Sequence, residues 1–461
     1  MLKKNEEYIV EIIDNGFQGE GISKIDGITV FIPNAIKGER IKIKIVKVQT
    51  NFAYGKILEI IEKSKNRQQE DCITYSKCGG CNLRHIKYEE TLNIKKSIVE
   101  NCMYKALKKE IKVNNVIGMK PPFYYRNKLQ YPLGFIDNKR VMGIYSERSH
   151  NIIATTKCMI QNELCQAIAN YAFEYIQENK IKVYDENDGT GTIRHIIVRI
   201  GVKTNEVLLT LVVNDNRFKD YVEDFTQYMI IKFPEIKAIV LNYNQENTNV
   251  ILGKKCETLY GRGYIYDILG EYKFKISPLS FYQINPIQTE ILYNTAIEFV
   301  GKDESRSLQN QIALDLYCGI GTIGIFASKY FKKVYGIEIV EEAIEDAKEN
   351  AKMNNIENIE FYAGDVEELL PKIIVKEKIK PNIVFVDPPR KGLDNNTVEL
   401  LKNLEPEKII YISCNPATLA RDLSNMEEKY EIKEVQPVDM FPYTSHVECV
   451  CLLKLKESTE K

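Results

Sequence analysis

The chain has 461 residues, of which 44% are hydrophobic and 28% are charged, and its formal net charge is -1. A domain averages roughly 150 residues, so this length predicts more than one core, and the composition excludes global disorder. The charged amino terminus and the absence of any run of roughly eighteen apolar residues predict a cytoplasmic protein without a membrane span. Because the net charge is close to zero, contact with nucleic acid would need local basic patches.

Residues 1–62 contain short alternating patterns typical of strands, namely EYIVEII, ITVFIP, RIKIKIVKV and YGKILEII, separated by glycine-rich turns. These patterns predict a small antiparallel β-barrel. Such barrels often bind nucleic acid through a charged face, although a solvated strand face explains the same charges. The basic residues along it are Lys37, Arg40, Lys42, Lys44 and Lys47.

Two further units are expected, over residues 63–284 and 285–461. In the first, a cysteine cluster and a helix from about Tyr88 to Lys109 precede strand-like runs with one helix near 160–178, which predicts a mixed, largely antiparallel domain. In the second, five short apolar strands alternate with helices and predict a Rossmann-like α/β domain with a parallel, doubly wound sheet. Two final strands without an intervening helix should pair as an antiparallel edge.

A glycine-rich loop, Asp315-Leu-Tyr-Cys-Gly-Ile-Gly-Thr-Ile-Gly324, should follow the first strand of that sheet. Glu338 ends the next strand, where a carboxylate can accept both hydroxyls of a ribose, and Asp365 is placed to meet an adenine amino group. The glycines and the acid alone would equally suit an NAD-dependent oxidoreductase. Asp387-Pro-Pro-Arg after the fourth strand favours a methyltransferase that modifies a base, since a dehydrogenase has no evident use for it.

Cys414 follows the fifth strand and directly precedes a predicted helix, whose start is expected to lower the pKa of the thiol. Thiolate addition to C6 of uracil would create an enolate with the electron density at C5 that methylation requires. Removal of the C5 proton then needs a base, for which Glu448 is the first candidate and His446 a weaker one. Cys318, in the glycine-rich loop, is a weaker candidate for the nucleophile.

The run Cys72-x5-Cys78-Gly-Gly-Cys81 brings three thiols onto a tight turn, as metal centres require. In a reducing compartment such cysteines are metal ligands or free thiols more often than disulfides. Four thiolates suit either zinc or an iron–sulfur cluster. Spacing leaves the fourth ligand open among Cys102, Cys158 and Cys165.

Several motifs together resemble the RNA (uracil-5)-methyltransferase family: SCNPATLARD, DPPRKGL, the Ser-His-Val-Glu ending and Phe-Tyr-Gln-Ile-Asn. The chain is most similar to the 23S rRNA (uracil-C5)-methyltransferases that carry an N-terminal TRAM domain, an OB-like barrel, and a 4Fe-4S cluster. The resemblance covers essentially the whole chain.

The resemblance implies a role for each motif residue. Cys414 would be the nucleophile and Glu448 the proton acceptor, and S-adenosyl-L-methionine would lie against Gln283, Tyr317, Glu338, Asp365 and Asp387. Thr322 stands where some relatives have Asn. The cluster ligands would be Cys72, Cys78, Cys81 and, in the run Cys158-Met-Ile-Gln, Cys158.

The implied partner is RNA, and the barrel and cysteine cluster favour 23S rRNA over the T-loop of tRNA. A non-catalytic RNA-binding or folding factor is the alternative of another class, against which the intact Cys414 and Glu448 argue. The target uridine must leave its helix to reach a thiol. A monomer is the default. Candidate RNA contacts in the central domain are Tyr124, Tyr125, Arg126, Lys128, Arg194, His195 and Arg199.

Overall fold

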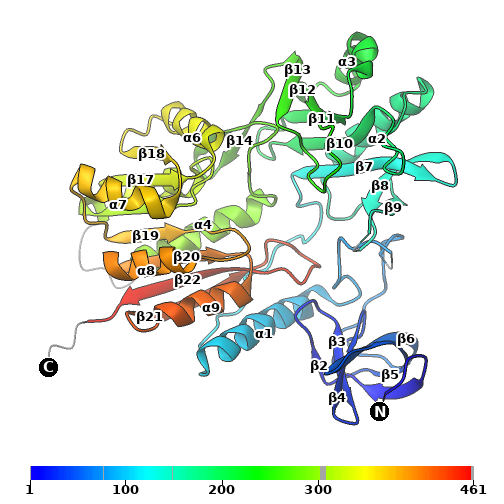
Figure 1. The fold of residues 1–461 in the computed structure, drawn as a ribbon, viewed down its shortest axis with the longest axis horizontal. Coiled ribbons are helices and arrows are strands. Elements are labelled where there is room, and N and C mark those ends of the chain that lie inside the picture. Colours follow the sequence, from blue (N-terminus) through cyan, green and yellow to red (C-terminus); the bar gives the residue numbers. More distant parts are fainter. Residues whose placement is uncertain (1, 76, 148, 302–307, 458–461) are drawn as a thin grey trace.

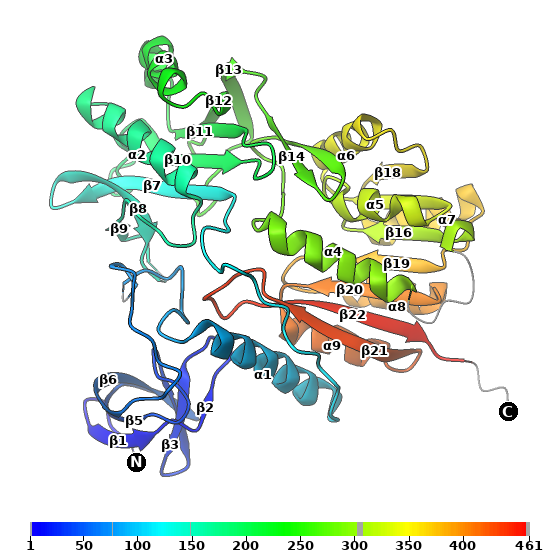
Figure 2. The same cartoon turned by 180° about the vertical axis from the view of Figure 1, so that it is seen from behind.

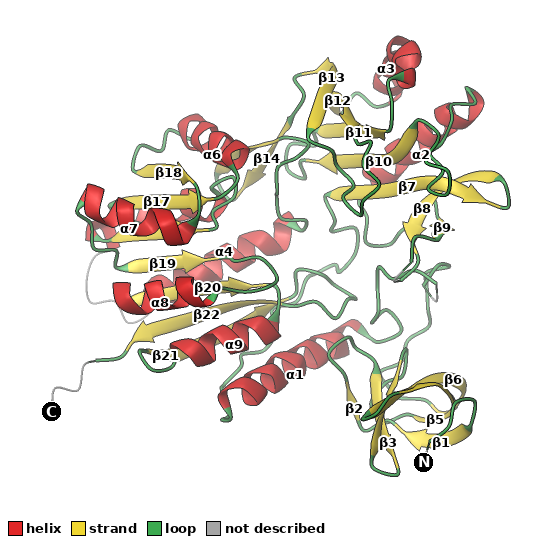
Figure 3. Ribbon diagram, in the orientation of Figure 1, coloured by secondary structure: helices red, strands yellow, loops and turns green. Residues whose placement is uncertain are grey.

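The computed structural model describes residues 2–75, 77–147, 149–301 and 308–457. Figure 1 shows a small N-terminal sheet, a central sheet and a larger C-terminal α/β sheet, with helix α1 running between the first and the last. Figure 3 shows that the N-terminal unit is built of strands, whereas helices flank both faces of the C-terminal sheet. Within the described ranges, no helix is long and apolar enough to cross a membrane.

The N-terminal sheet has six strands in the order β1-β5-β6-β4-β3-β2. Alternate residues such as Val30 and Ile32 point into an aliphatic core, which explains the period of two in the sequence. The expected antiparallel pairing holds except between β4 and β6, which run parallel. Two short strands, β2 and β3, were not predicted. The strands are β1 (Glu7–Glu11), β2 (Asp14–Asn15), β3 (Gly21–Ile25), β4 (Ile28–Ile32), β5 (Arg40–Val48) and β6 (Phe52–Glu62).

Helix α1 (Tyr88–Leu107) confirms the predicted helix and packs beside the C-terminal sheet. Val99, Met103 and Leu107 recur at helical spacing and share one hydrophobic cluster with the C-terminal strands. The helix therefore belongs to the C-terminal core, although it precedes the central sheet in the chain.

The central sheet has seven strands in the order β13-β12-β11-β10-β7-β8-β9 and is antiparallel except between β11 and β12. Helix α2 confirms the predicted helix; α3 was not predicted. Both helices pack on one face of the sheet. The elements are β7 (Lys128–Ile136), β8 (Lys139–Tyr145), β9 (Ile152–Ala154), α2 (Glu163–Glu178), β10 (Ile193–Ile200), β11 (Val207–Val213), α3 (Val222–Lys232), β12 (Ile236–Tyr243) and β13 (Lys255–Gly261).

A hairpin of β14 (Ile265–Leu269) and β15 (Tyr272–Ile276) connects the central and C-terminal sheets. Its side chains, Phe274 among them, lie in the same hydrophobic cluster as Phe326 of the C-terminal domain. The hairpin thus packs with the C-terminal domain before residue 285, where the sequence pattern changes. The predicted division at 62 and 284 remains a proposal.

The C-terminal sheet has seven strands in the order β18-β17-β16-β19-β20-β22-β21. The five predicted parallel strands and the antiparallel pair at the end are confirmed. Strand order reverses between β16 and β19, where ligands bind in such sheets. The strands are β16 (Ile312–Leu316), β17 (Lys333–Glu338), β18 (Ile359–Ala363), β19 (Ile383–Val386), β20 (Lys408–Ser413), β21 (Tyr430–Val438) and β22 (Glu448–Leu455). The helices are α4 (Pro286–Gly301), α5 (Thr322–Ala327), α6 (Glu341–Met353), α7 (Val366–Glu377), α8 (Asn395–Leu404) and α9 (Pro416–Met426).

Candidate active site and cysteine cavity

The glycine-rich loop after β16 is held by two carboxylates. Gly324 N donates to Asp315 Oδ2 at 2.7 Å, and Gly319 N donates to Glu338 Oε2 at 3.1 Å. Gly321 has a φ of 80°, the left-handed region that glycine adopts without strain. The loop therefore closes against the end of β17, and Glu338 lies at the predicted place.

Asp315 is a functional candidate that the sequence analysis did not select. Burial, against a hydrogen bond from Gly324 and with the added effect of Asp387 and Glu338, raises the pKa of this carboxyl to about 8. Its Oδ1 atom is buried and has no hydrogen-bond partner among the described residues. A lone acid inside the apolar strand IALDL was the available signal.

Three predicted residues meet at the carboxyl edge of the sheet. Asp387 follows β19, Cys414 follows the neighbouring β20, and Glu448 begins β22, which pairs with β20. Burial raises the pKa of Glu448 to about 8, with Asp387 adding to the rise and Arg390 opposing it. Burial also raises the pKa of Asp387 to about 7. The site therefore gathers acids that are partly protonated at neutral pH.

The expected lowering of the Cys414 pKa is wrong. Burial and, after it, the charges of Glu448 and Asp387 raise the pKa of the thiol to about 11, against the opposing effect of Arg390. Burial and carboxyls that lie far away in the sequence therefore dominate at this thiol, although it directly precedes α9.

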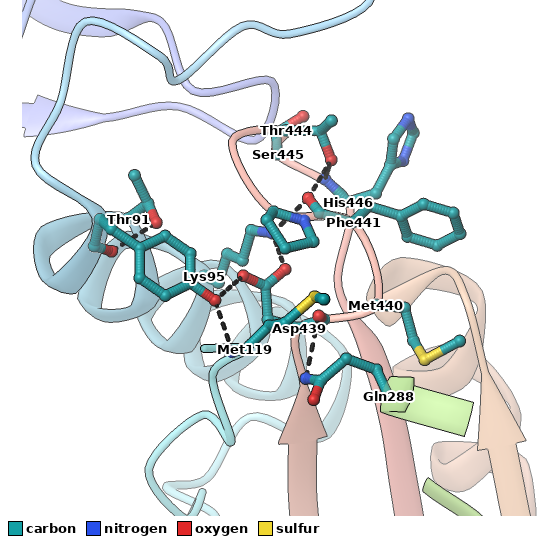
Figure 4. Close-up of polar contacts among 12 residues, drawn as sticks. Thr91, Lys95, Met119, Gln288, Asp439, Met440, Phe441, Thr444, Ser445 and His446 are labelled. Carbon is teal, nitrogen blue, oxygen red and sulfur yellow. Dashed lines mark hydrogen bonds and ion pairs between the residues drawn. The ribbon is translucent and has the colours of Figure 1, made fainter. Parts of the chain in front are cut away.

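The loop between β21 and β22 is anchored from helix α1 by a buried ion pair (Figure 4). Asp439 accepts from Lys95 Nζ at 2.5 Å and from Tyr88 Oη at 2.7 Å, and both Lys95 and Asp439 have fully buried side chains. Lys95 also donates to the Phe441 carbonyl at 3.0 Å. From α4, Gln288 donates to the Asp439 carbonyl at 3.1 Å. Two helices thus fix the chain that leads to Glu448.

His446 lies in this loop next to Phe441, with ring centroids 6.0 Å apart. Burial lowers the pKa of its imidazole, and Arg390 lowers it further, so the ring is neutral at pH 7. Cys318 is buried in the glycine-rich loop, and burial raises the pKa of its thiol. His446 shares the neighbour Arg390 with Cys414 and Glu448, whereas the carboxyls that act on Cys318 are those of Asp315 and Glu338.

The other cofactor candidates lie around the loop. Tyr317 Oη is 3.3 Å from Thr397 Oγ1, and burial raises the pKa of Tyr317 to about 12. The Asp365 carboxylate caps helix α7 by accepting from Glu367 N at 2.8 Å, which gives it a structural role as well. Gln283 lies between β15 and α4, where its carbonyl accepts from Asn127 at 3.0 Å.

The four predicted ligands Cys72, Cys78, Cys81 and Cys158 line a single cavity of about 200 Å³. Of the two other candidates for the fourth ligand, Cys102 packs beside the cluster around the C-terminal sheet and Cys165 lies in the core of the central sheet. The structure therefore brings Cys158 to the other three. In the described part of the chain, no group of three or more His, Cys, Asp or Glu side chains is arranged to hold a metal ion.

Burial raises the pKa values of the Cys78, Cys81 and Cys158 thiols, that of Cys81 to about 12, and neighbouring thiols add to the rise. The turn that carries Cys81 also contacts the loop before Glu448: Asn82 donates to Ser445 Oγ at 2.9 Å and accepts from Ser445 N at 2.7 Å. The cysteine cavity and the candidate active site are therefore mechanically linked.

Among the candidate RNA contacts, two make structural contacts and two line the cysteine cavity. Arg194 is buried, stacks on Tyr184 at 4.5 Å and donates to the Asn244 carbonyl at 2.8 Å, so its contacts are structural. Tyr125 is buried too and donates to the Pro442 carbonyl at 3.2 Å. Arg126 and Lys128 line the cysteine cavity.

On the N-terminal sheet, three of the predicted basic residues are neutralised by neighbouring acids, in the pairs Lys37–Asp14, Arg40–Glu62 and Lys42–Glu7. The predicted charged face is thus weaker than its lysine count suggests.

Comparison with known proteins identifies the family. Residues 268–456 match the family model of tRNA (uracil-5-)-methyltransferases, and residues 2–58 match the TRAM domain. An uncharacterized RNA methyltransferase of Clostridium acetobutylicum is 46% identical over 457 residues, which is 98% of each chain. One from Staphylococcus aureus is 43% identical over 457 residues, 99% of each chain.

Among solved structures, the tRNA (uracil-54, C5)-methyltransferase of Pyrococcus abyssi, in complex with S-adenosyl-L-homocysteine, superposes with a TM-score of 0.77 at 26% identity. The match covers 97% of this chain and all of that one. Together with the relatives and the class I fold, this match leads to one conclusion. The chain belongs to the family of S-adenosylmethionine-dependent RNA (uracil-C5)-methyltransferases and carries an N-terminal TRAM domain.

Proposed function

We propose that the chain transfers a methyl group from S-adenosylmethionine to C5 of a specific uridine in 23S rRNA, with Cys414 as nucleophile and Glu448 as proton acceptor. The observation that carries this proposal is the convergence of Cys414, Glu448 and Asp387 on neighbouring strand ends. Asp387 is thereby close enough to raise the pKa values of both Cys414 and Glu448, and Glu448 close enough to raise that of Cys414. This is the group that C5 methylation needs.

The chemistry follows in balanced steps. The Cys414 thiol loses its proton to solvent water, and the thiolate sulfur adds to C6 of the extruded uracil, which makes an enolate. C5 of the enolate then takes the methyl group from the sulfonium, whose sulfur leaves as neutral thioether. Glu448 removes the proton that remains on C5, the electron pair restores the C5–C6 double bond, and Cys414 departs as thiolate.

The acids of the site suit a cationic co-substrate. Asp315, Asp387 and Glu448 are buried or partly buried, and their pKa values are raised to about 8, 7 and 8. A sulfonium and an ammonium group nearby would favour their ionised forms and, in the same way, the Cys414 thiolate. Binding of S-adenosylmethionine would thus prepare both the base and the nucleophile.

For the remaining contacts we assign Glu338 to the ribose and Asp365 to the adenine, with Gln283 and Tyr317 beside the reacting groups. Support differs among them. Glu338 is placed at the glycine-rich loop by its hydrogen bond from Gly319. Asp365 is exposed, and one of its carboxylate oxygens caps α7. Its other carboxylate oxygen can therefore serve the adenine.

For the cysteine cavity we propose a 4Fe-4S cluster held by Cys72, Cys78, Cys81 and Cys158. The donor set fits, because all four thiols line one cavity and Arg84 and Arg126 beside it favour thiolates. The cluster would hold Cys72, Cys78 and Cys81 against the central domain and, through Asn82, the loop before Glu448. No step of methyl transfer is assigned to it. Zinc at the same residues is the competing metal.

The choice of rRNA rests on the resemblance to ribosomal enzymes, and tRNA is the second candidate substrate because the matching Pyrococcus enzyme acts on tRNA. We expect a monomer. A non-catalytic RNA-binding factor would leave the three converging site residues without a purpose.

The decisive experiment measures transfer of labelled methyl to unmodified large-subunit rRNA and, separately, to tRNA, by wild type and Cys414→Ala. Formation of 5-methyluridine in rRNA that is lost in the variant supports the proposal and identifies the site. Methylation of tRNA alone would reassign the substrate. Labelling of neither RNA by metal-replete protein would favour the binding-factor alternative.

A further inference from the structure

Two cationic side chains face each other on the central sheet. Lys128, the first residue of β7, is the register partner of Arg199 on β10. Their chain neighbours Leu129 and Val198 point to the face covered by α2 and α3. Because side chains alternate along a strand, Lys128 and Arg199 lie together on the opposite face.

Both cations are withdrawn from water. Arg199 is only 8% exposed, and Lys128 is partly buried. Burial and, after it, the charges of Arg199 and Arg126 together lower the pKa of Lys128 to about 8, and burial lowers the pKa of Arg199 to about 10. Burial of the two charges therefore costs desolvation free energy, and the like charges repel each other.

The described residues supply no anion for this pair. Neither Lys128 nor Arg199 forms an ion pair within the described ranges, the nearest acceptor being the Ser277 carbonyl, 3.5 Å from Arg199 Nη1. Arg199 Nε is buried and has no hydrogen-bond partner there. Lys95, by contrast, is fully buried opposite Asp439 at 2.5 Å. The same chain thus matches one buried cation fully and leaves two adjacent ones unmatched.

The position of the Lys128–Arg199 pair relative to the active-site loop indicates what the pair binds. Asn127, next to Lys128, donates to the Gln283 carbonyl in the segment that leads to α4. On the other side, Arg126 lines the cysteine cavity and lowers the pKa of His446. The pair therefore lies close to the active-site loop, on the side of the central sheet.

We propose that Lys128 and Arg199 bind a backbone phosphate of the RNA substrate, next to the uridine that enters the active site. A phosphodiester offers two acceptor oxygens, which suit the fork of an arginine and the point charge of a lysine. The phosphate supplies the anion that the protein lacks. This inference rests on the proposed RNA substrate and names the part of it that these residues hold.

The main rival is that these cations balance the charge of the cysteine centre, since Lys128 lines that cavity. Arg199 does not line it, so the two residues can be tested separately. Lys128→Met and Arg199→Met remove the charges and keep an unbranched side chain. Exposed Lys182, changed to Met, is the matched control.

The experiment measures the Kd of metal-replete protein for unmodified rRNA and tRNA transcripts over a series of salt concentrations, together with Tm and the visible absorbance of the metal centre. We expect each variant to bind the preferred transcript about tenfold more weakly. The slope of log affinity against log salt should fall by about 0.7–0.9 for a lost phosphate contact. Tm of the free protein should rise by about 2 °C, because an unmatched buried charge is removed. Lys182→Met should change none of these.

The opposite pattern overturns the inference. A lower Tm with unchanged affinity and salt slope would make the pair structural. Loss of visible absorbance with unchanged RNA affinity would assign the cations to the cysteine centre. Because binding is measured directly, it still tests the pair if wild type methylates neither transcript, whereas wild type that binds neither RNA refutes both proposals.

Discussion

The thiol of Cys414, at the first site, and the thiols of the cysteine cavity, at the second site, are both largely buried but have different neighbours. Cys414 stands alone beside the carboxyls of Glu448 and Asp387, which raise its pKa after burial. Cys81 lies among other thiols and close to Arg84, which lowers its pKa. A thiol among acids needs an incoming cation to ionise, as S-adenosylmethionine would supply. A thiol among thiols needs a metal.

The comparison teaches that burial alone does not define what a cysteine does. The groups next to a cysteine decide whether its thiolate forms only when substrate binds or is held permanently by a bound metal. Replacing Cys414 should therefore affect activity with little effect on stability, whereas replacing a cysteine of the cavity should affect stability first. The hydrogen bonds between Asn82 and Ser445, together with the one from Leu83 N to the Tyr443 carbonyl, are routes by which the second site would also affect the first.

The largest expected effect is that of Cys414→Ala. Loss of the nucleophile should reduce methyl transfer by about 10⁴-fold or more, because no covalent adduct can form. Tm and visible absorbance should stay unchanged. Single-turnover transfer of labelled methyl measures the loss. Cys318→Ala is the matched control and should retain activity; the reverse result would make Cys318 the nucleophile.

The next largest effect is expected of Lys95→Met. This variant tests the packing that supports the first site separately from the chemistry of that site. Removal of one partner of the buried Lys95–Asp439 pair should lower the free energy of unfolding by about 3–5 kcal/mol. Denaturant unfolding monitors it. The double variant with Asp439→Leu should recover part of the loss, because no charge remains unpaired. A double variant less stable than Lys95→Met would show that the pair is not the source of the effect.

Cys81→Ser tests the second thiol site. If the four cysteines hold a metal centre, this variant loses its visible absorbance and about 3–4 kcal/mol of stability, as expected when a ligand is bound at a hundred to a thousand times its Kd. Methyl transfer should fall less than in Cys414→Ala. Cys102→Ser, outside the cavity, is the control. Unchanged metal content in Cys81→Ser would contradict the ligand assignment, and zinc in wild type would replace the cluster.

Sequence patterns predicted much of this arrangement. Apolar strands between helices predicted the C-terminal sheet, and the motifs after β19 and β20 placed Asp387 and Cys414 at its edge. The failures have a common physical cause. Helix α3 is stabilised by packing on the central sheet, and only three of its residues, Phe225, Thr226 and Met229, are buried. The raised pKa of Cys414 comes from burial and then from carboxyls distant in the sequence.

Burial was the other quantity that the sequence could not supply. Arg199 reads as a surface residue in IRHIIVRI, yet its strand is buried on both faces. Asp315 is the lone acid of a predicted strand, but the sequence does not show that it is fully buried and partly unpaired. In both cases the functional signal is a polar group that lacks a partner, which only the packed structure reveals.

The smallest expected effect concerns the protonation of the first site. Raised folded pKa values mean that Glu448 and Asp387 stabilise the protein below the ordinary carboxyl pKa. That stability is lost as pH rises through about 8 and 7. The free protein should therefore lose stability between pH values of about 5 and 8. Binding of a cation to the same ionised groups should strengthen in parallel.

Calorimetric titration at several pH values tests this linkage. Affinity for S-adenosylmethionine should rise by up to about tenfold per pH unit near pH 7–8, whereas S-adenosylhomocysteine, which lacks the sulfonium charge, should show a smaller change. Glu448→Gln should reduce the difference between the two ligands, because it removes one of the titrating groups. Equal pH dependence for both ligands would mean that the acids do not face the sulfonium. The thiolate of Cys414 would then need another cation, and Arg390, which already lowers its pKa, is the nearest source.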